Sequence, residues 1–128
     1  MEHSPAFLRL VEQAKQEICE MSCQEFFSEH YAKLRQGDGD VLLIDVREDH
    51  EWNQMYIPCA KHMGKGILER DIEKTCPDKD KKIILYCGGG FRSALSAQAL
   101  KSMGYRNVFS LAGGIKQWKL EQRPLEYF

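Results

Sequence analysis

The chain has 128 residues, a length that suits one domain with a single hydrophobic core. Hydrophobic residues make up 43% of it and charged residues 29%, without repeats or low-complexity runs, which excludes a fibrous or disordered chain. A formal net charge of −1 argues against a general nucleic-acid-binding protein, because such proteins carry a strongly basic face.

The first third of the chain predicts two helices separated by a short strand. A helical pattern runs from Ser4 to about Ile18 and looks like an addition to the main domain. A short strand is expected around residues 18–21. Ser22, with Glu25 three positions later, then gives a capping box for a helix that extends to about residue 35.

The rest of the chain predicts strands that alternate with helices. VLLIDV at 41–46 and KIILYC at 82–87 are compact apolar runs with the length of buried strands. The other expected elements are a turn at 37–40, a helix at 47–55, a shorter strand at 57–63, a helix at 66–76, a helix at 94–103, a strand at 107–111, a turn at 113–114 and a short helix at 115–119. This alternation indicates an α/β fold with a mostly parallel sheet.

A cysteine followed by three glycines lies where the second buried strand ends. Ligands of parallel sheets bind beyond the carboxyl ends of the strands, and Cys87 is at that end. Free N–H groups at the start of a helix favour a thiolate over a thiol. Gly88, Gly89 and Gly90 lack a Cβ, so their N–H groups can point inward as an anion-binding nest. The segment predicts a reactive thiolate, and the alternative is a buried packing cysteine before a glycine turn.

The three residues after the glycines each have two roles open to them. Arg92 either offers its charge to a substrate or braces the loop by bonding carbonyls or a carboxylate. Ser93 either caps the following helix or reaches the sulfur with its hydroxyl. Phe91 either shapes the mouth of a pocket or packs in the core.

Four segments resemble motifs of the rhodanese-like sulfurtransferase family, in the family's order, over roughly residues 20–120. CGGGFRS fits its C-x-x-G-x-R active-site loop, and LLIDVRE resembles its D-V-R-E segment. MYIPCAKHM is similar to its G-H-I-P-G-A segment, and GYRNVFSLAGGIKQW to its closing G-Y-x-N-V-x-x-L-x-G-G-x-x-x-W. The resemblance implies a three-layer sandwich with a central parallel five-stranded sheet flanked by helices. The expected division is an N-terminal helical extension at 1–18, the rhodanese-like domain at 19–120 and a C-terminal tail at 121–128.

The resemblance also implies the activity of a thiosulfate or persulfide sulfurtransferase that needs no metal and no organic cofactor. Cys87 is expected to be the catalytic residue and to carry sulfur as a persulfide. The expected substrate-binding loop consists of Gly88, Gly89, Gly90, Phe91, Arg92 and Ser93. The expected partners are a small anionic sulfur donor and a thiol or cyanide acceptor, or a protein that carries a persulfide. The chain is expected to act as a monomer or weak homodimer.

Several alternatives stay open beside this activity. Gly88 and Gly89 stand where well-known thiosulfate-using members have Arg and Lys, so a persulfide is as plausible a donor as thiosulfate. The chain could instead be a non-catalytic binding module or a persulfide carrier with the same fold. A thiolate phosphatase or arsenate reductase is disfavoured, because four residues separate Cys87 from Arg92 whereas the related phosphatases have five.

Two further residues lie at the end of the first buried strand and are expected to support the site. Asp45 could orient the active loop through a hydrogen bond, and Arg47 could pair with Glu48 or Glu51. A structural role is favoured over a catalytic one for both residues. Trp52 and Trp118 are expected in the core.

The remaining features bear on cellular location and on the state of the cysteines. No stretch approaches the roughly 20 apolar residues that span a bilayer, and the N-terminal segment is unlike a signal peptide, so a cytoplasmic location without a membrane partner is expected. The five cysteines lack the spacing of a disulfide framework, and reduced thiols are expected. Cys19 and Cys23 could bind metal with His30 or His3, but the helix start between them argues against it. Cys59 and Cys76 are expected to be packing residues, or one of them resolves a Cys87 persulfide.

Charge differs between the two halves of the chain. Residues 1–64 contain 6 Lys or Arg and 12 Asp or Glu, whereas residues 65–128 contain 12 and 7. The basic half holds the glycine loop and so suits an anionic substrate. A solvated charge distribution without a functional role also accounts for the difference.

Overall fold

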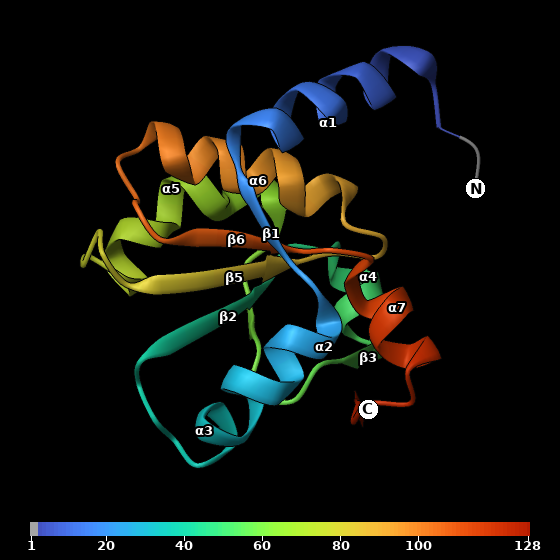
Figure 1. Cartoon of the computed structure of the whole chain (residues 1–128), viewed down its shortest axis with the longest axis vertical. Coiled ribbons are helices and arrows are strands. Elements are labelled where there is room, and N and C mark those ends of the chain that lie inside the picture. Colours follow the sequence, from blue (N-terminus) through green and yellow to red (C-terminus); the bar gives the residue numbers. More distant parts are fainter. Residues whose placement is uncertain (1–2) are drawn as a thin grey trace.

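The computed structural model of the protein describes residues 3–128, and a five-stranded sheet lies at its centre (Figure 1). All neighbouring strands are parallel, in the order β1–β6–β5–β2–β4. The strands are β1 (Cys19–Met21), β2 (Val41–Asp45), β4 (Lys61–His62), β5 (Lys82–Tyr86) and β6 (Val108–Leu111). The α/β class and the central parallel five-stranded sheet expected from the sequence are confirmed.

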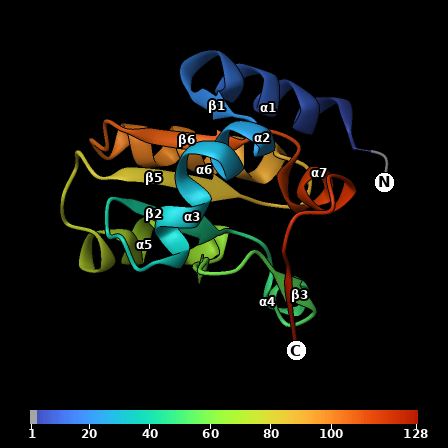
Figure 2. The same cartoon turned by 60° about the horizontal axis from the view of Figure 1, so that its bottom comes forward.

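Helices cover both faces of this sheet (Figures 1 and 2). One face is covered by α5 (Lys65–Thr75) and α6 (Phe91–Ser102), and α1 (Pro5–Glu17) packs along α6. The other face is covered by α7 (Gly114–Leu120) and by a continuous helical segment made of α2 (Cys23–Phe26), the π-helical η1 (Phe27–Tyr31) and α3 (Ala32–Arg35). A short helix, α4 (Asp49–Trp52), follows β2. The protein therefore has three layers, with α1 as an additional outer element.

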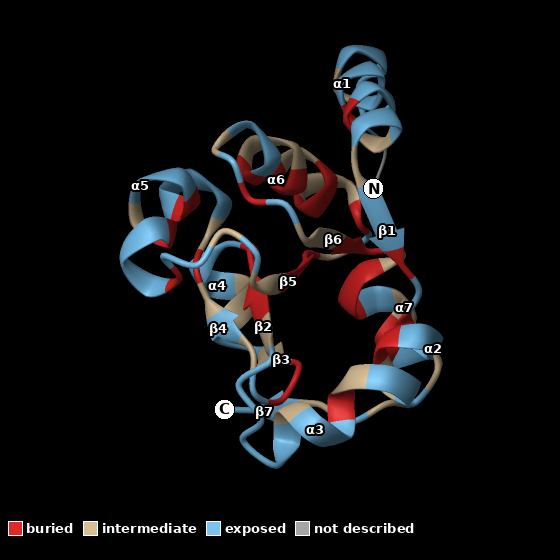
Figure 3. Cartoon of the chain, turned by 60° about the vertical axis from the view of Figure 1, so that its left-hand side comes forward, coloured by how far each residue is buried: buried red, intermediate tan, exposed pale blue. Residues whose placement is uncertain are grey.

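The central strands are apolar on both sides because their side chains alternate between two cores. Ile83 and Leu85 of β5 pack in the core beneath α5 and α6, whereas Ile84 and Tyr86 pack in the core formed with α2 and α7. Trp118 of α7 is fully buried in that second core, as expected. Figure 3 shows buried residues along the central strands and on the sides of the helices that face them, while most of α1 is exposed.

Of the strand expected at 57–63, only β4 at 61–62 is present. β3 (Met55–Tyr56) precedes it and begins at the end of the segment expected as a helix at 47–55, of which only α4 is helical. A turn lies between β3 and β4, and Cys59 in this turn adopts a φ of 70°. Such a φ is uncommon for a residue with a Cβ. The turn was not expected because no glycine stands at this position to indicate it. β3 pairs antiparallel with β7 (Glu126–Tyr127), so residues in the segment expected as a tail form a two-stranded ribbon.

Two other expectations differ in detail from the structure. The helix expected to about residue 35 contains the π-helical stretch η1 rather than regular α-helix throughout. Trp52 is half-buried instead of lying in the core, since its ring stacks between those of Tyr56 and His62, with centroid distances of 4.1 and 4.9 Å. Among residues 3–128, none of the helices combines the length and the apolar character that crossing a membrane requires.

Candidate active site

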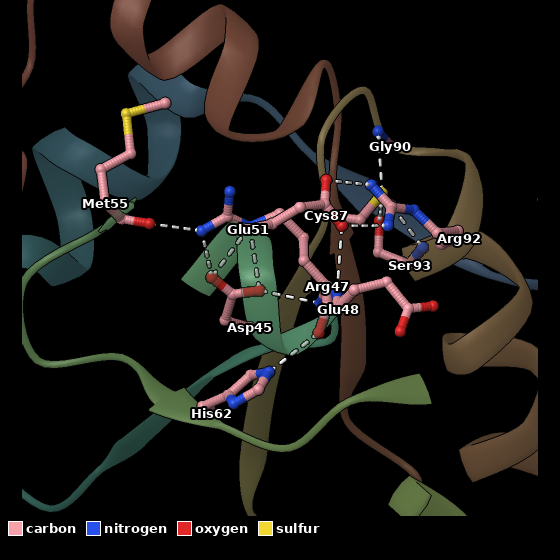
Figure 4. A network of polar contacts seen from close by, with 10 residues as sticks. All are labelled: Asp45, Arg47, Glu48, Glu51, Met55, His62, Cys87, Gly90, Arg92 and Ser93. Atoms are coloured by element: carbon pink, nitrogen blue, oxygen red, sulfur yellow. Dashed lines mark hydrogen bonds and ion pairs between the residues drawn. The ribbon is translucent and has the colours of Figure 1, made fainter. Parts of the chain in front are cut away.

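The loop between β5 and α6 encloses the sulfur atom of Cys87 (Figure 4). Cys87 is 1% exposed, and its Sγ accepts hydrogen bonds from the backbone N–H groups of Gly90 at 3.2 Å and Ser93 at 3.3 Å. Within the described loop, Gly88 and Gly89 do not donate to the sulfur, in contrast to the nest expected from all three glycines. Gly90 has a φ of 96°, and a Cβ there would lie 3.2 Å from the Gly113 nitrogen. This position therefore requires glycine.

The start of α7 holds the other side of the loop. Its N–H groups at Ile115 and Lys116 donate to the carbonyl oxygens of Cys87 and Gly88, at 2.9 and 3.0 Å. This close approach depends on Gly114, because a Cβ there would lie 2.5 Å from both oxygens. With two carbonyl groups engaged by α7, the loop directs N–H groups rather than oxygens at the sulfur.

Two buried hydroxyl groups lie behind the sulfur. Ser93 Oγ is 3.5 Å from Cys87 Sγ and 2.8 Å from Ser110 Oγ, and both serines are fully buried. The hydroxyl of Ser93 thus reaches the sulfur, whereas Gly90 occupies the N-cap position of α6. Sequence reasoning missed Ser110, whose one signal is a polar side chain within the apolar run of β6.

Arg92 braces the loop against α4. Its guanidinium makes two hydrogen bonds to the Glu51 carboxylate, at 2.6 and 3.1 Å. Hydrogen bonding by Arg92 lowers the pKa of Glu51 from 4.5 to about 2, and the same contact raises the pKa of Arg92. Glu51 also accepts the N–H of Glu48 at 3.0 Å, which fixes the first turn of α4. Of the two roles open to Arg92, the structure displays the bracing one.

Asp45 and Arg47 form a buried ion pair beside the active loop (Figure 4). Arg47 Nη2 lies 2.9 Å from Asp45 Oδ2, and the same nitrogen donates to the Met55 carbonyl. The expected pairing of Arg47 with Glu48 or Glu51 is wrong, because the side chain turns inward toward the end of β2. The Asp45 carboxylate bonds the backbone and side chain of Arg47 rather than the active loop. The pair therefore ties the end of β2 to β3.

The other cysteines lie apart from the Cys87 loop or behind it. Cys23 is buried next to the start of α7, and burial raises the pKa of its thiol to about 11. Burial also raises the pKa of Cys76, whereas Cys19 and Cys59 are exposed. Residues 3–128 contain no group of three or more His, Cys, Asp or Glu side chains arranged to hold a metal ion.

A cleft of about 1140 Å³ opens above Cys87. Its floor comes from the loop, and its walls come from α1, α4 and α7. Phe91 lines this cleft and also packs against α1, so both roles considered for its side chain are present.

Comparison with known proteins gives a consistent family and fold. A model of the Rhodanese-like domain matches residues 28–121. The thiosulfate sulfurtransferase GlpE of Coxiella burnetii is 35% identical over 80 residues, which cover 62% of this chain and 73% of that protein.

Two solved structures resemble the whole or most of the chain. A Rhodopseudomonas palustris protein of unknown function, described as a possible tyrosine phosphatase, is 27% identical with a TM-score of 0.77 and covers 98% of this chain and 99% of its own. A rhodanese-like domain from Anabaena is 25% identical with a TM-score of 0.72 and covers 85% and 79%. The fold expected from the sequence motifs is confirmed.

Proposed function

The chain belongs to the rhodanese-like domain family, whose members include sulfurtransferases, and from this premise we propose that it transfers sulfane sulfur through a persulfide on Cys87. The donor is thiosulfate or a persulfide, and the acceptor is a thiol or cyanide. One observation carries the proposal: the backbone N–H groups of Gly90 and Ser93 both donate to the Cys87 sulfur at the carboxyl end of β5. Donors fixed in this way stabilise negative charge on a reacting atom.

The proposed reaction has two displacement steps. The Cys87 thiolate attacks the outer sulfur of thiosulfate, the new S–S bond forms, and sulfite leaves with the electron pair of the broken bond. The persulfide then lies within reach of the N–H groups of Gly90 and Ser93. An acceptor nucleophile takes the terminal sulfur, and the electron pair returns to Cys87 as thiolate. Ping-pong kinetics follow from this order.

The length of the loop favours sulfur transfer over phosphoryl transfer. Four residues separate Cys87 from Arg92, whereas the related phosphatases have five and so a wider loop for phosphate. The two hydrogen bonds from Arg92 to Glu51 support a bracing role for its side chain. We further propose a cytoplasmic location, in keeping with five cysteines that are all free thiols.

Intact-protein mass spectrometry after incubation with thiosulfate tests the covalent step. We expect a gain of about 32 Da, one sulfur atom, that disappears when cyanide is added. Cys87→Ser should keep the fold but lose both the mass gain and the turnover. Cys59→Ser, at an exposed cysteine outside the cleft, is the matched control and should load as wild type does.

Two results would contradict the proposal. One is a mass gain that persists in Cys87→Ser, because the sulfur would then be carried elsewhere. The other is the absence of loading with both thiosulfate and a small-molecule persulfide, which would favour a binding module.

A further inference from the structure

The charged side chains that line the cleft above Cys87 balance one another. Among the residues that the structure describes there, the cations are Arg92 and Lys116 and the carboxylates are Glu48 and Glu51. Arg92 and Glu51 are moreover bound to each other. A dianionic substrate such as thiosulfate therefore gains no net attraction from the lining beyond the N–H donors of the loop.

Large apolar side chains also line the same cleft. Phe7 and Leu8 of α1 face it from one side, and Leu120 of α7 lines it as well. Phe91 joins the loop to this surface, with its ring 6.4 Å from that of Phe7. Figures 1 and 2 show the first turns of α1 and the helix α7 at the same end of the molecule, beside the loop that follows β5.

Two of these side chains are open to solvent although they are large and apolar. Leu8 is 42% exposed and Leu120 is 71% exposed. Cys87 is 1% exposed and lines this cleft together with both leucines, so a substrate that enters the cleft can reach the sulfur and the leucines. Covering them with apolar substrate atoms would remove apolar surface from water, which is favourable in proportion to the area covered.

We propose that the sulfur acceptor is an organic thiol with an apolar group, which packs on Leu8 and Leu120 while its sulfur reaches the Cys87 persulfide. The inference rests on the proposed sulfur transfer and names the substrate class for it. In the step, the acceptor thiolate forms a bond to the terminal sulfur as the bond to Cys87 Sγ breaks. The electron pair returns to Cys87, and an organic persulfide leaves.

A series of straight-chain thiols tests this assignment. Ethanethiol, propanethiol and butanethiol carry the same reacting group and differ in methylene number. The measured quantity is the second-order rate constant for discharge of preloaded Cys87 persulfide in a single turnover. We expect it to rise about twofold to fourfold with each methylene in the wild type.

Leucine variants locate the effect on the protein. The double variant Leu8→Ser with Leu120→Ser should keep its fold, because both side chains are exposed, and should lose most of the dependence on chain length. Leu10→Ser is the matched control, since Leu10 is 56% exposed on the same helix α1 but lies outside the cleft. It should keep the dependence of the wild type.

Two outcomes would overturn the inference alone. In one, all three thiols discharge the Cys87 persulfide of the wild type with equal rate constants. In the other, the double variant retains the full dependence on chain length. Failure of Cys87 to load at all would instead overturn the proposed function, and is seen before any acceptor is added.

Discussion

Replacing Glu51 with Gln removes the charge that pairs with Arg92 and keeps an oxygen that can accept the Glu48 N–H. Hydrogen bonding by Arg92 lowers the pKa of Glu51 from 4.5 to about 2. A difference of that size corresponds to at most about 3.5 kcal/mol, at about 1.4 kcal/mol for each pKa unit. Because 25% of the Glu51 side chain is exposed, solvent screening reduces the expected contribution to about 1–2 kcal/mol.

The lowered pKa of Glu51 fixes the sign of the pH dependence. Its contribution to the free energy of unfolding is fully present above pH 4.5 and is lost as the pH falls toward 2. Urea denaturation at a series of pH values should therefore show a wild-type advantage of about 1–2 kcal/mol near neutral pH that shrinks on acidification. Glu48→Gln, which removes an exposed carboxylate from the same segment, should retain the pH dependence of the wild type. An identical pH dependence in wild type and Glu51→Gln would refute the reasoning.

Two further substitutions test the packing around the loop. Gly114→Ala would place a Cβ 2.5 Å from two carbonyl oxygens of the active loop, at a φ of 57°. We expect it to lower the free energy of unfolding by about 2 kcal/mol or more and to reduce sulfur loading of Cys87. Gly66→Ala is the control, because a Cβ there would meet no atom within 4 Å, and it should raise the free energy of unfolding by up to roughly 1 kcal/mol. Asp45→Asn would leave the buried guanidinium of Arg47 without its counter-charge, and urea denaturation should show a loss of about 3–5 kcal/mol. A loss under about 1 kcal/mol would contradict a buried ion pair at this place.

Features that depend on neighbouring residues could be predicted from the sequence. The strands at 41–46 and 82–87 are apolar throughout because both of their faces are buried, and that composition is visible in the sequence. The loop could be predicted for the same reason, since Cys87, the glycines and the start of α6 are contiguous. The N-terminal helix α1 could be predicted from the helical spacing of its apolar residues and from Ser4 at its start.

Features that depend on contacts between distant segments could not be predicted. Arg92 meets Glu51 from a different helix, and Ser110 meets Ser93 from a different strand. No local pattern distinguishes these partners from other carboxylates and hydroxyls in the chain. The turn at Cys59 was missed because a residue with a Cβ adopts a conformation that usually marks glycine.

Because α7 donates hydrogen bonds to the loop, the conformation of the loop depends on a segment that is synthesised after it. The loop emerges from the ribosome before Ile115 and Lys116, whose N–H groups hold the carbonyls of Cys87 and Gly88. A nascent chain that ends before α7 thus contains the whole CGGGFRS segment but lacks the N–H groups that hold its carbonyls. Cys87 therefore gains its complete set of loop hydrogen bonds only after α7 has been added to the chain.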